Sequence, residues 1–356
     1  MKIGILTFHR AYNYGAVLQC YSLQEALKAM GHDVWVIDYR QPYIEKSYKP
    51  FRLMMWLGYV IHVRKDAFRY LRSYPNRKRK EHNFEKFISE RLHCTSSCTK
   101  DNIPQDFDVY IIGSDQVWNW DCLGTKVDGV YLGQFNYFAD SKLVGYAISA
   151  KLGSFDKIGV ERLRETLDRF SFISFREEII SKVVACITNS SQFPVCCDPV
   201  FLNGSSFWDK LTDDKFKYRN YVLTYGVRNI KDDPTYLYKK GISFADRLGC
   251  ELIDASSGKF SVTDFVSLFK YARYVITTSF HGTAFSLIFR RPFYSIKLHD
   301  GSDERYSSLL HIIGADEYCV DMNFEPDINR GELPSKISDN LTTYSQKSRK
   351  FLSQIK

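Results

Sequence analysis

The chain has no apolar run long enough to form a transmembrane helix. Its longest apolar stretch outside the expected strands, residues 51–65, contains Arg52 and His62 and falls short of the ~20 residues that span a bilayer. The amino terminus, MKIGILTFHR, has neither the length nor the cleavage site of a secretory signal and predicts a first buried strand. We therefore expect a cytoplasmic protein.

The chain also lacks the signatures of several common sites. Its nine cysteines have no disulfide-framework spacing, and Cys196 and Cys197 are adjacent, which predicts reduced thiols. Cys94 and Cys98 have no second ligand pair at a distance typical of zinc sites, so we expect no metal. The first polar loop has no G-x-G-x-x-G and no Walker lysine, and we expect no cofactor.

Basic residues outnumber acidic residues in the chain. A formal net charge of +8 favours an anionic partner, such as a nucleotide, a phosphate, a nucleic acid or a membrane surface. The basic residues gather in one helical segment without a recognised nucleic-acid-binding module, which argues against nucleic acid. The rest of the composition, 44% hydrophobic and 25% charged, is that of an ordinary soluble globular protein.

Apolar strands alternate with amphipathic helices along the chain. The strand KIGILTF, the loop HRAYNYG, a helix that ends at Gly31 and the strand HDVWVIDY together predict a right-handed βαβ unit. Strand after strand then stops in a polar turn before a helix, which is the pattern of doubly wound parallel sheets. Pro194 and Pro199 interrupt this series, and a second series begins at YVLTYGV.

We therefore predict an α/β protein of two Rossmann-like parallel-sheet domains that face a cleft. A chain of 356 residues is long enough for two such cores, and the shared cleft is the usual ligand position in folds of this kind. The predicted boundaries are 1–195 for the first domain, with a basic helical insertion at about 44–100, 196–335 for the second domain, and 336–356 for a C-terminal helix.

The predicted insertion is rich in aromatic and basic residues. Its apolar stretch is followed by a segment in which arginine and lysine greatly outnumber the acids. An apolar, aromatic helix beside such a segment is suited to lie on an anionic membrane surface. A solvated helical hairpin that packs on the domain explains the same pattern, because charge runs usually face water. The sequence leaves both interpretations open.

The first strand ends in a loop that suits an anion. Gly15, in TFHRAYNYGAVLQ, allows a ligand to approach the backbone closely, and the helix that follows presents free N–H groups and its positive dipole end. Asn13 is a candidate ligand-binding residue, and it serves equally well as a helix cap.

A polar cluster in IIGSDQVWN follows another buried strand. It offers a hydroxyl, a carboxylate and amides beside an aromatic face, a combination that suits sugar recognition. Turn chemistry explains Ser-Asp on its own but does not explain the tryptophan. The candidate residues are Ser114, Asp115, Gln116, Trp118 and Asn119.

An arginine and a histidine stand at two further strand ends. The guanidinium of Arg176 matches a carboxylate or a phosphate, or else pairs with Glu177 and Glu178. In VITTSFHGTAFSLIFRRPF, His281 lies between a strand and a helix whose N-terminus Gly282 leaves open. An imidazole and N–H donors then converge, which suits a phosphate-bearing reactant with His281 as general acid or base. A satisfied core histidine is the alternative.

The order of these motifs resembles the polysaccharide pyruvyl transferase family over nearly the whole chain. The matching series is NYG, YIIGSDQ, the serine-ended strand GYAISAKLG, SFREE, DPVFL, and SFHGTAFSL followed by RRPF. Members of this family are similar in architecture to two-domain GT-B glycosyltransferases. They transfer the enolpyruvyl unit of phosphoenolpyruvate to two hydroxyls of one sugar, which forms a cyclic pyruvate ketal and releases phosphate.

The resemblance implies roles for individual residues. The family's strand-end arginine falls on Arg176 and its catalytic histidine on His281, while Ser149 of GYAISAKLG joins the substrate-binding candidates. Many members have Arg-Leu-His-Gly where this chain has a serine, Ser279, in the first position. We therefore expect Lys297 or Arg305 to supply the cation that holds the donor's phosphate or carboxylate.

The resemblance also implies substrates. Phosphoenolpyruvate is the donor, and the acceptor is a galactose-type residue of a glycan carried on polyprenyl diphosphate, in bacterial surface-polysaccharide (capsule) assembly. The basic aromatic insertion would then contact the membrane peripherally. Two other functions stay open: a GT-B glycosyltransferase that uses a nucleotide sugar, since the fold does not decide between the reactions, and a non-catalytic glycan-binding protein, because the arginine is missing at Ser279.

Overall fold

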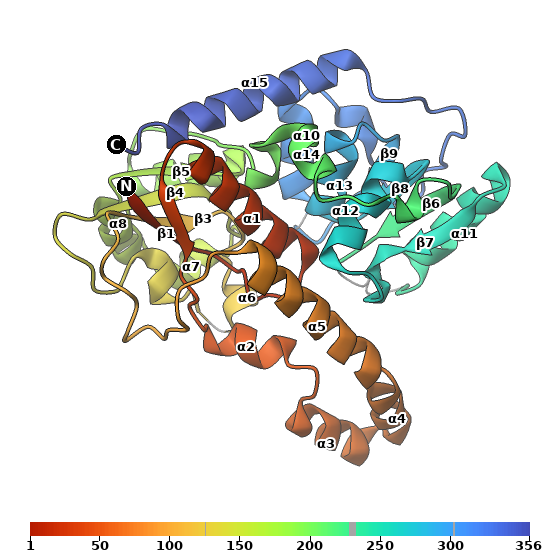
Figure 1. Cartoon of the computed structure of the whole chain (residues 1–356), viewed down its shortest axis with the longest axis horizontal. Coiled ribbons are helices and arrows are strands. Elements are labelled where there is room, and N and C mark those ends of the chain that lie inside the picture. Colours follow the sequence, from red (N-terminus) through yellow and green to blue (C-terminus); the bar gives the residue numbers. More distant parts are fainter. Residues whose placement is uncertain (125, 228–232, 302) are drawn as a thin grey trace.

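The computed structural model describes residues 1–124, 126–227, 233–301 and 303–356 of the chain. Within them, strands and helices alternate around two five-stranded sheets, and the strand pairings of both sheets are parallel. Figure 1 shows the first sheet near the two chain termini and the second at the other end of the body. The predicted α/β class with two parallel sheets is confirmed.

The first sheet has the strand order β2-β1-β3-β4-β5. Its central strands are apolar at successive positions because helices cover both faces. Ile111 packs in the cluster that contains the helix α1, and its neighbour Ile112 packs with α8 and α9. These elements are β1 (Lys2–Leu6), α1 (Tyr14–Ala29), β2 (Asp33–Val36), β3 (Val109–Gly113), β4 (Lys142–Ile148), α8 (Val160–Arg169), β5 (Phe172–Phe175) and α9 (Glu178–Thr188).

The second sheet has the order β10-β9-β8-β6-β7. Val275 packs against the layer of α12 and α13, whereas Ile276 packs against the layer of α11. These elements are β6 (Tyr221–Tyr225), α11 (Tyr236–Leu248), β7 (Glu251–Asp254), α12 (Val262–Tyr271), β8 (Tyr274–Thr277), α13 (Phe280–Ile288), β9 (Phe293–Ile296), α14 (Glu304–Ile312) and β10 (Cys319–Val320). Short helices complete the chain: α6 (Trp120–Leu123), η1 (Gly129–Leu132), α7 (Ser154–Ile158), η2 (Pro199–Phe201), α10 (Gly204–Asp209), η3 (Asp214–Phe216), η4 (Ala255–Ser257) and η5 (Asp316–Tyr318).

One hydrophobic cluster runs through both halves of the molecule. The ring of Tyr14 in α1 stacks on Phe265 of α12 with centroids 4.3 Å apart, which joins the two layers directly. The last helix, α15 (Ser335–Leu352), returns to the first half, where Ser348 accepts a hydrogen bond from the backbone N–H of Cys197. Figure 1 shows α15 lying across both halves, so the two sheets are held together at two places.

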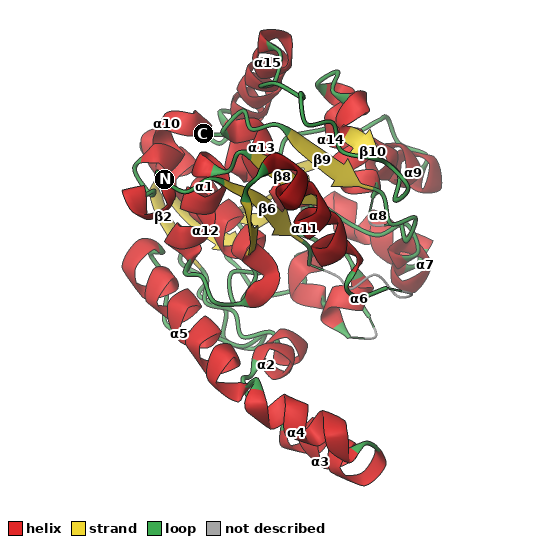
Figure 2. Cartoon of the chain, turned by 90° about the vertical axis from the view of Figure 1, so that its right-hand side faces the viewer, coloured by secondary structure: helices red, strands yellow, loops and turns green. Residues whose placement is uncertain are grey.

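The predicted insertion forms four helices, α2 (Pro42–Tyr48), α3 (Leu53–His62), α4 (Arg64–Arg72) and α5 (Tyr74–Arg91). Phe84 and Phe87 in the second half of α5 are buried against α1 and α12. Figures 1 and 2 show α3 and α4 projecting from the body at the other end of α5. Of the helices in the described residues, none combines the length and the hydropathy needed to cross a bilayer.

Candidate functional site

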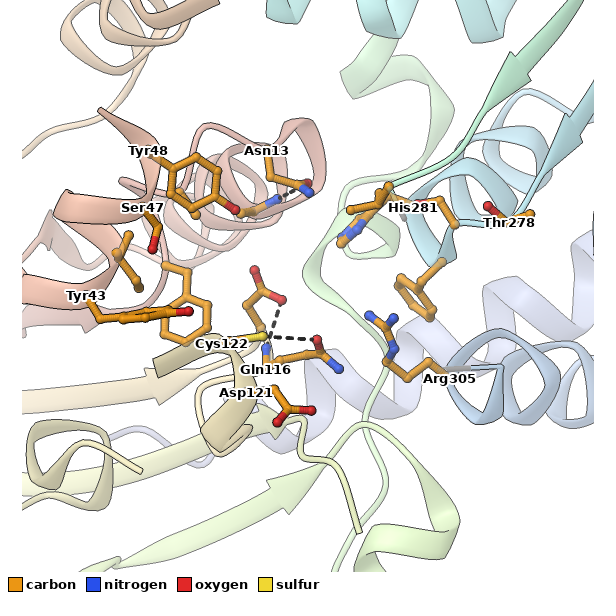
Figure 3. Close-up of a pocket in the computed structure, with 18 residues that line it drawn as sticks. Asn13, Tyr43, Ser47, Tyr48, Gln116, Asp121, Cys122, Thr278, His281 and Arg305 are labelled. Atoms are coloured by element: carbon orange, nitrogen blue, oxygen red, sulfur yellow. Dashed lines mark hydrogen bonds between the residues drawn. The ribbon is translucent and has the colours of Figure 1, made fainter. Parts of the chain in front are cut away.

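A cavity of about 320 Å³ lies between the two halves, where strands of both sheets end. The loops after β1 and β3 and the helices α2 and α6 form one wall, and the turn between β8 and α13 forms the other, together with α14 (Figure 3). The lining residues are Phe8, Ala11, Asn13, Ala16, Tyr43, Ile44, Ser47, Tyr48, Asp115, Gln116, Asp121, Cys122, Val227, Thr278, Ser279, Phe280, His281 and Arg305.

His281 lies in the first turn of α13 and reaches the cavity, with its side chain 9% exposed. Its ring packs flat on the backbone of Gly15 at the start of α1. A Cβ atom at position 15 would lie 1.9 Å from Nδ1 and 2.4 Å from Cε1 of the ring, closer than any real contact. Gly15 is therefore needed for space, and this contact joins the two halves at the cavity.

A buried carboxylate lies on the other side of the same ring. Nε2 of His281 is 3.6 Å from Oδ2 of Asp198, which is within ion-pair range but too long for a hydrogen bond. Burial alone would raise the pKa of Asp198, but the charges of His281 and Arg176 outweigh burial and hold that pKa below its ordinary value. Asp198 is thus an ionised group under the histidine.

Arg176 holds this carboxylate in place. Its Nη1 donates to Oδ2 of Asp198 at 2.7 Å, its Nε donates to Oε1 of Glu177 at 2.9 Å, and its Nη2 donates to Oγ of Ser149 at 2.9 Å. Arg176 is 4% exposed, and within the described ranges neither it nor Ser149 lines the cavity. The structure therefore places both predicted residues beneath the wall, where they support Asp198.

The N-terminus of α13 opens toward the same cavity. Ser279 occupies the N-cap position and lines the cavity, but its side chain makes no capping hydrogen bond. Gly282 in this turn packs closely on Thr277, because a Cβ atom there would lie 2.0 Å from its Oγ1. The uncapped first turn presents backbone N–H groups and the positive end of the helix dipole, which together favour an anion.

Asn13 caps a helix, and it also lines the cavity. Its Oδ1 accepts hydrogen bonds from the backbone N–H groups of Gly15 at 2.9 Å and Ala16 at 3.5 Å, so it caps α1. The residue also lines the cavity opposite His281 (Figure 3). Asn13 therefore fixes the start of α1, and with it the surface on which the imidazole rests.

The polar cluster after β3 divides between cavity and core. Asp115 and Gln116 line the cavity, whereas the buried Ser114 donates to Oδ2 of Asp198 at 3.4 Å. The expectation that Trp118 offers an aromatic face to a sugar needs correction. The ring is fully buried and its Nε1 donates to the carbonyl of Tyr131 at 2.7 Å, so it belongs to the core.

A second cavity of about 210 Å³ adjoins the first and shares Gln116 and Arg305 with it. The buried Asn119, which caps α6 by accepting from the N–H of Asp121, also lines this second space. Of the two cations expected to replace the family arginine, Arg305 lines both cavities. Lys297 lines neither in the part of the chain that the structure describes.

Two parts of this site were not predicted from the sequence. Asp198 begins the DPVFL segment, and its position before a proline gave no sign that it meets the histidine. The helix α2, which contributes Tyr43, Ile44, Ser47 and Tyr48 to the wall, belongs to the insertion and has no sequence motif. Both were missed because their roles depend on contacts between distant parts of the chain.

The two facing parallel sheets with a cavity at their strand ends define a GT-B-like fold of the Rossmann type. The sequence pattern of the polysaccharide pyruvyl transferase family matches residues 13–300. The chain therefore belongs to this family of transferases. No curated protein matches the chain at a significant level.

Several solved structures are similar to this chain over nearly its whole length, at low sequence identity. One is a UDP-GlcNAc 2-epimerase from Methanocaldococcus jannaschii, with a TM-score of 0.48 and 12% identity over 99% of this chain and 100% of that chain. Another is the E. coli heptosyltransferase WaaC with ADP, with a TM-score of 0.39 and 11% identity over 99% of each chain. Likenesses at this level say nothing about the reaction of this chain.

Proposed function

We propose that the protein transfers the enolpyruvyl group of phosphoenolpyruvate to two hydroxyls of one sugar residue. Family membership supports the reaction class, and the charges around His281 support the chemistry. The cluster beneath the cavity contains one guanidinium, Arg176, and two carboxyl groups, Glu177 and Asp198. By formal charge it carries one unbalanced negative charge, and Oδ2 of Asp198 lies 3.6 Å from Nε2 of His281. This placement of an anionic cluster beside the imidazole is the observation on which the proposal rests.

In the proposed reaction His281 serves as the general acid. It protonates the methylene carbon of phosphoenolpyruvate while the oxygen of one sugar hydroxyl bonds to the neighbouring carbon, and the proton of that hydroxyl returns to His281 through solvent. The oxygen of the second hydroxyl then bonds to the same carbon as the carbon–oxygen bond to phosphate breaks, and its proton leaves with the phosphate. The products are a cyclic ketal, which carries a methyl and a carboxylate group, and inorganic phosphate.

The anionic donor suits the first cavity. The uncapped N-terminus of α13 and the guanidinium of Arg305 offer a phosphate or carboxylate two kinds of donor on the same side of the cavity (Figure 3). We therefore assign phosphoenolpyruvate to this cavity, with its methylene carbon toward His281. The sugar enters from the second cavity, where Gln116 and Asn119 provide amide groups for its hydroxyls.

We further infer that the acceptor is a galactose-type residue of a saccharide carried on polyprenyl diphosphate, and that the reaction takes place in the bacterial cytoplasm during surface-polysaccharide assembly. The acceptor itself is inferred from the family.

The direct test supplies phosphoenolpyruvate with galactosides, both free and lipid-linked. We expect release of inorganic phosphate that depends on the acceptor, together with the mass gain of a pyruvate ketal in the product. His281→Ala should lower the rate by about 10²–10⁴-fold. His311, an exposed histidine paired with Asp316, provides the matched control, and His311→Ala should leave the rate unchanged.

Two results would contradict the proposal. If nucleotide is released from a sugar nucleotide with the same acceptors, the protein is a glycosyltransferase. If glycans bind but no donor is turned over by the wild type, and His281→Ala binds them equally well, the protein is a glycan-binding module without this chemistry.

A further inference from the structure

The hairpin of α3 and α4 exposes an unusual amount of apolar surface. Met54 is 77% exposed, Ile61 is 74% exposed and Phe68 is 69% exposed. Ten of the exposed large hydrophobic residues in the described chain lie between positions 51 and 74. They are Phe51, Leu53, Met54, Leu57, Val60, Ile61, Val63, Phe68, Leu71 and Tyr74. Apolar residues gathered in this way mark an interaction surface.

The same segment carries the excess charge of the whole protein. Residues 51–80 contain nine basic side chains and one acidic side chain, Asp66, which gives a net charge of +8. The formal net charge of the entire chain is also +8, so the rest of the protein is formally neutral. The acid is already paired with Arg69 at 3.2 Å. A patch with this charge favours an anionic partner surface.

The hairpin is an ordered part of the fold rather than a loose tail. Arg77 at the start of α5 donates to the carbonyls of Pro50 and Tyr70 at 2.7 and 2.9 Å, and its guanidinium carbon lies 3.9 Å from the ring centre of Tyr70. The hydroxyl of Tyr70 in turn accepts from the N–H of Arg52. These contacts tie both ends of the hairpin to α5 and leave its apolar side chains facing outward.

The hairpin projects beside the wall of the first cavity. The wall helix α2 ends at Tyr48, and α3 begins at Leu53. The hairpin leads into α5 at Tyr74, which lies about 15 Å along that helix from the buried Phe84, at 1.5 Å per residue. Figure 2 shows α3 and α4 as the most distant part of this end of the molecule, with α2 between them and the body.

We propose that the α3–α4 hairpin docks on the surface of an anionic lipid bilayer. The apolar side chains around Met54, Ile61 and Phe68 enter the interfacial region, and the basic side chains of α4 and α5 meet lipid phosphates. Docked in this way, the hairpin holds α2 and the cavity beside the membrane. This goes beyond the proposed reaction, because docking requires neither substrate.

The test is sedimentation of the full chain with phosphatidylcholine vesicles that contain or lack phosphatidylglycerol. We expect binding to the anionic vesicles that weakens as salt is added. The triple variant Met54→Ser/Ile61→Ser/Phe68→Ser should lose tenfold or more of this binding, because it withdraws apolar area from the bilayer. Its matched control carries Phe138→Ser and Tyr218→Ser, two exposed aromatic positions outside the hairpin, and should bind like the wild type.

The contribution of charge is tested separately. A variant with Lys65→Gln, Arg69→Gln and Arg72→Gln should lose binding to anionic vesicles, whereas a control with Lys182→Gln, Lys347→Gln and Lys350→Gln should not. Circular dichroism and thermal unfolding of each variant show that the body remains folded.

Three outcomes would overturn the inference. They are equal binding to neutral and anionic vesicles, equal binding by the triple variant and the wild type, and a wild-type dimer that the triple variant converts to a monomer. The last outcome would show that a second copy of the chain covers the patch. Vesicle binding without turnover would contradict the proposed function and leave this inference standing, and turnover without vesicle binding would do the reverse.

Discussion

Replacing Gly15 with alanine tests whether the position of the imidazole matters. The added Cβ atom would lie 1.9 Å from Nδ1 of His281, whereas ordinary contacts begin near 3.4 Å. The ring and the start of α1 must then separate by roughly 1.5 Å, given how densely such interfaces pack. A displacement of about 1 Å at a reacting group can cost about 10²-fold in rate. We expect Gly15→Ala to lower kcat by about this factor.

The fold should survive this substitution. Overpacking of one methyl group costs about 1–3 kcal/mol of unfolding free energy, part of which the chain recovers by moving the ring. Urea denaturation measures this cost, and phosphate release from phosphoenolpyruvate with a galactoside measures the rate. Gly331→Ala is the matched control, because a Cβ atom at this exposed position has no neighbour within 4 Å.

A double-mutant cycle decides whether the loss acts through the ring. In the His281→Ala background the ring atoms that clash with the new methyl group are gone, so Gly15→Ala should cause no further loss of rate. A wild-type kcat for Gly15→Ala would refute the reasoning. So would a loss of the same size in both backgrounds, because the effect would then come from α1 itself.

Further substitutions probe the charges of the site. Asp198→Asn should lower the unfolding free energy by about 3 kcal/mol at neutral pH. Because the folded protein lowers the pKa of this carboxyl, the difference from wild type should be present above about pH 4 and vanish as the pH falls through the lowered pKa. Urea denaturation at several pH values would show this. Arg176→Met leaves two carboxyl groups buried without their cation and should lower the unfolding free energy by about 3–5 kcal/mol, whereas Arg176→Lys should lower it less. Equal losses would contradict the role given to the charge of Arg176. Arg305→Gln should raise KM for phosphoenolpyruvate about tenfold or more with a smaller effect on kcat, and Lys297→Gln should change neither, as steady-state kinetics would show.

The sequence allowed the main parts of the site to be predicted because of a property of parallel sheets. The carboxyl ends of their strands meet at one edge, so polar residues that follow several apolar strands gather there. This rule is enough to bring Asn13, Asp115, Gln116 and His281 to a single cavity. The residue spacing locates the loops but does not say which side chains of each loop face outward.

The failures have the same physical origin. Trp118 looked like a sugar platform because it follows two polar residues, but a backbone carbonyl within reach satisfies its N–H and lets the ring enter the core. The sequence left open whether Arg176 binds an anion or pairs with its own glutamates. It pairs with Glu177, and its other two partners come from the end of β4 and from the connection between the sheets. Tertiary contacts decide which of these side chains are buried, and a local sequence pattern does not contain them.

The position of Asp198 links the chemistry to the arrangement of the two halves. This residue lies in the connection between the sheets, where the next residue, Pro199, accepts a hydrogen bond from Ser22 of α1 at 2.6 Å. The carboxylate and Gly15 are thus both attached to the first half, while His281 belongs to the second. Any rotation between the halves would lengthen the ion pair and open the glycine contact together. It follows that His281 contacts Asp198 and Gly15 together only in the observed arrangement of the two halves.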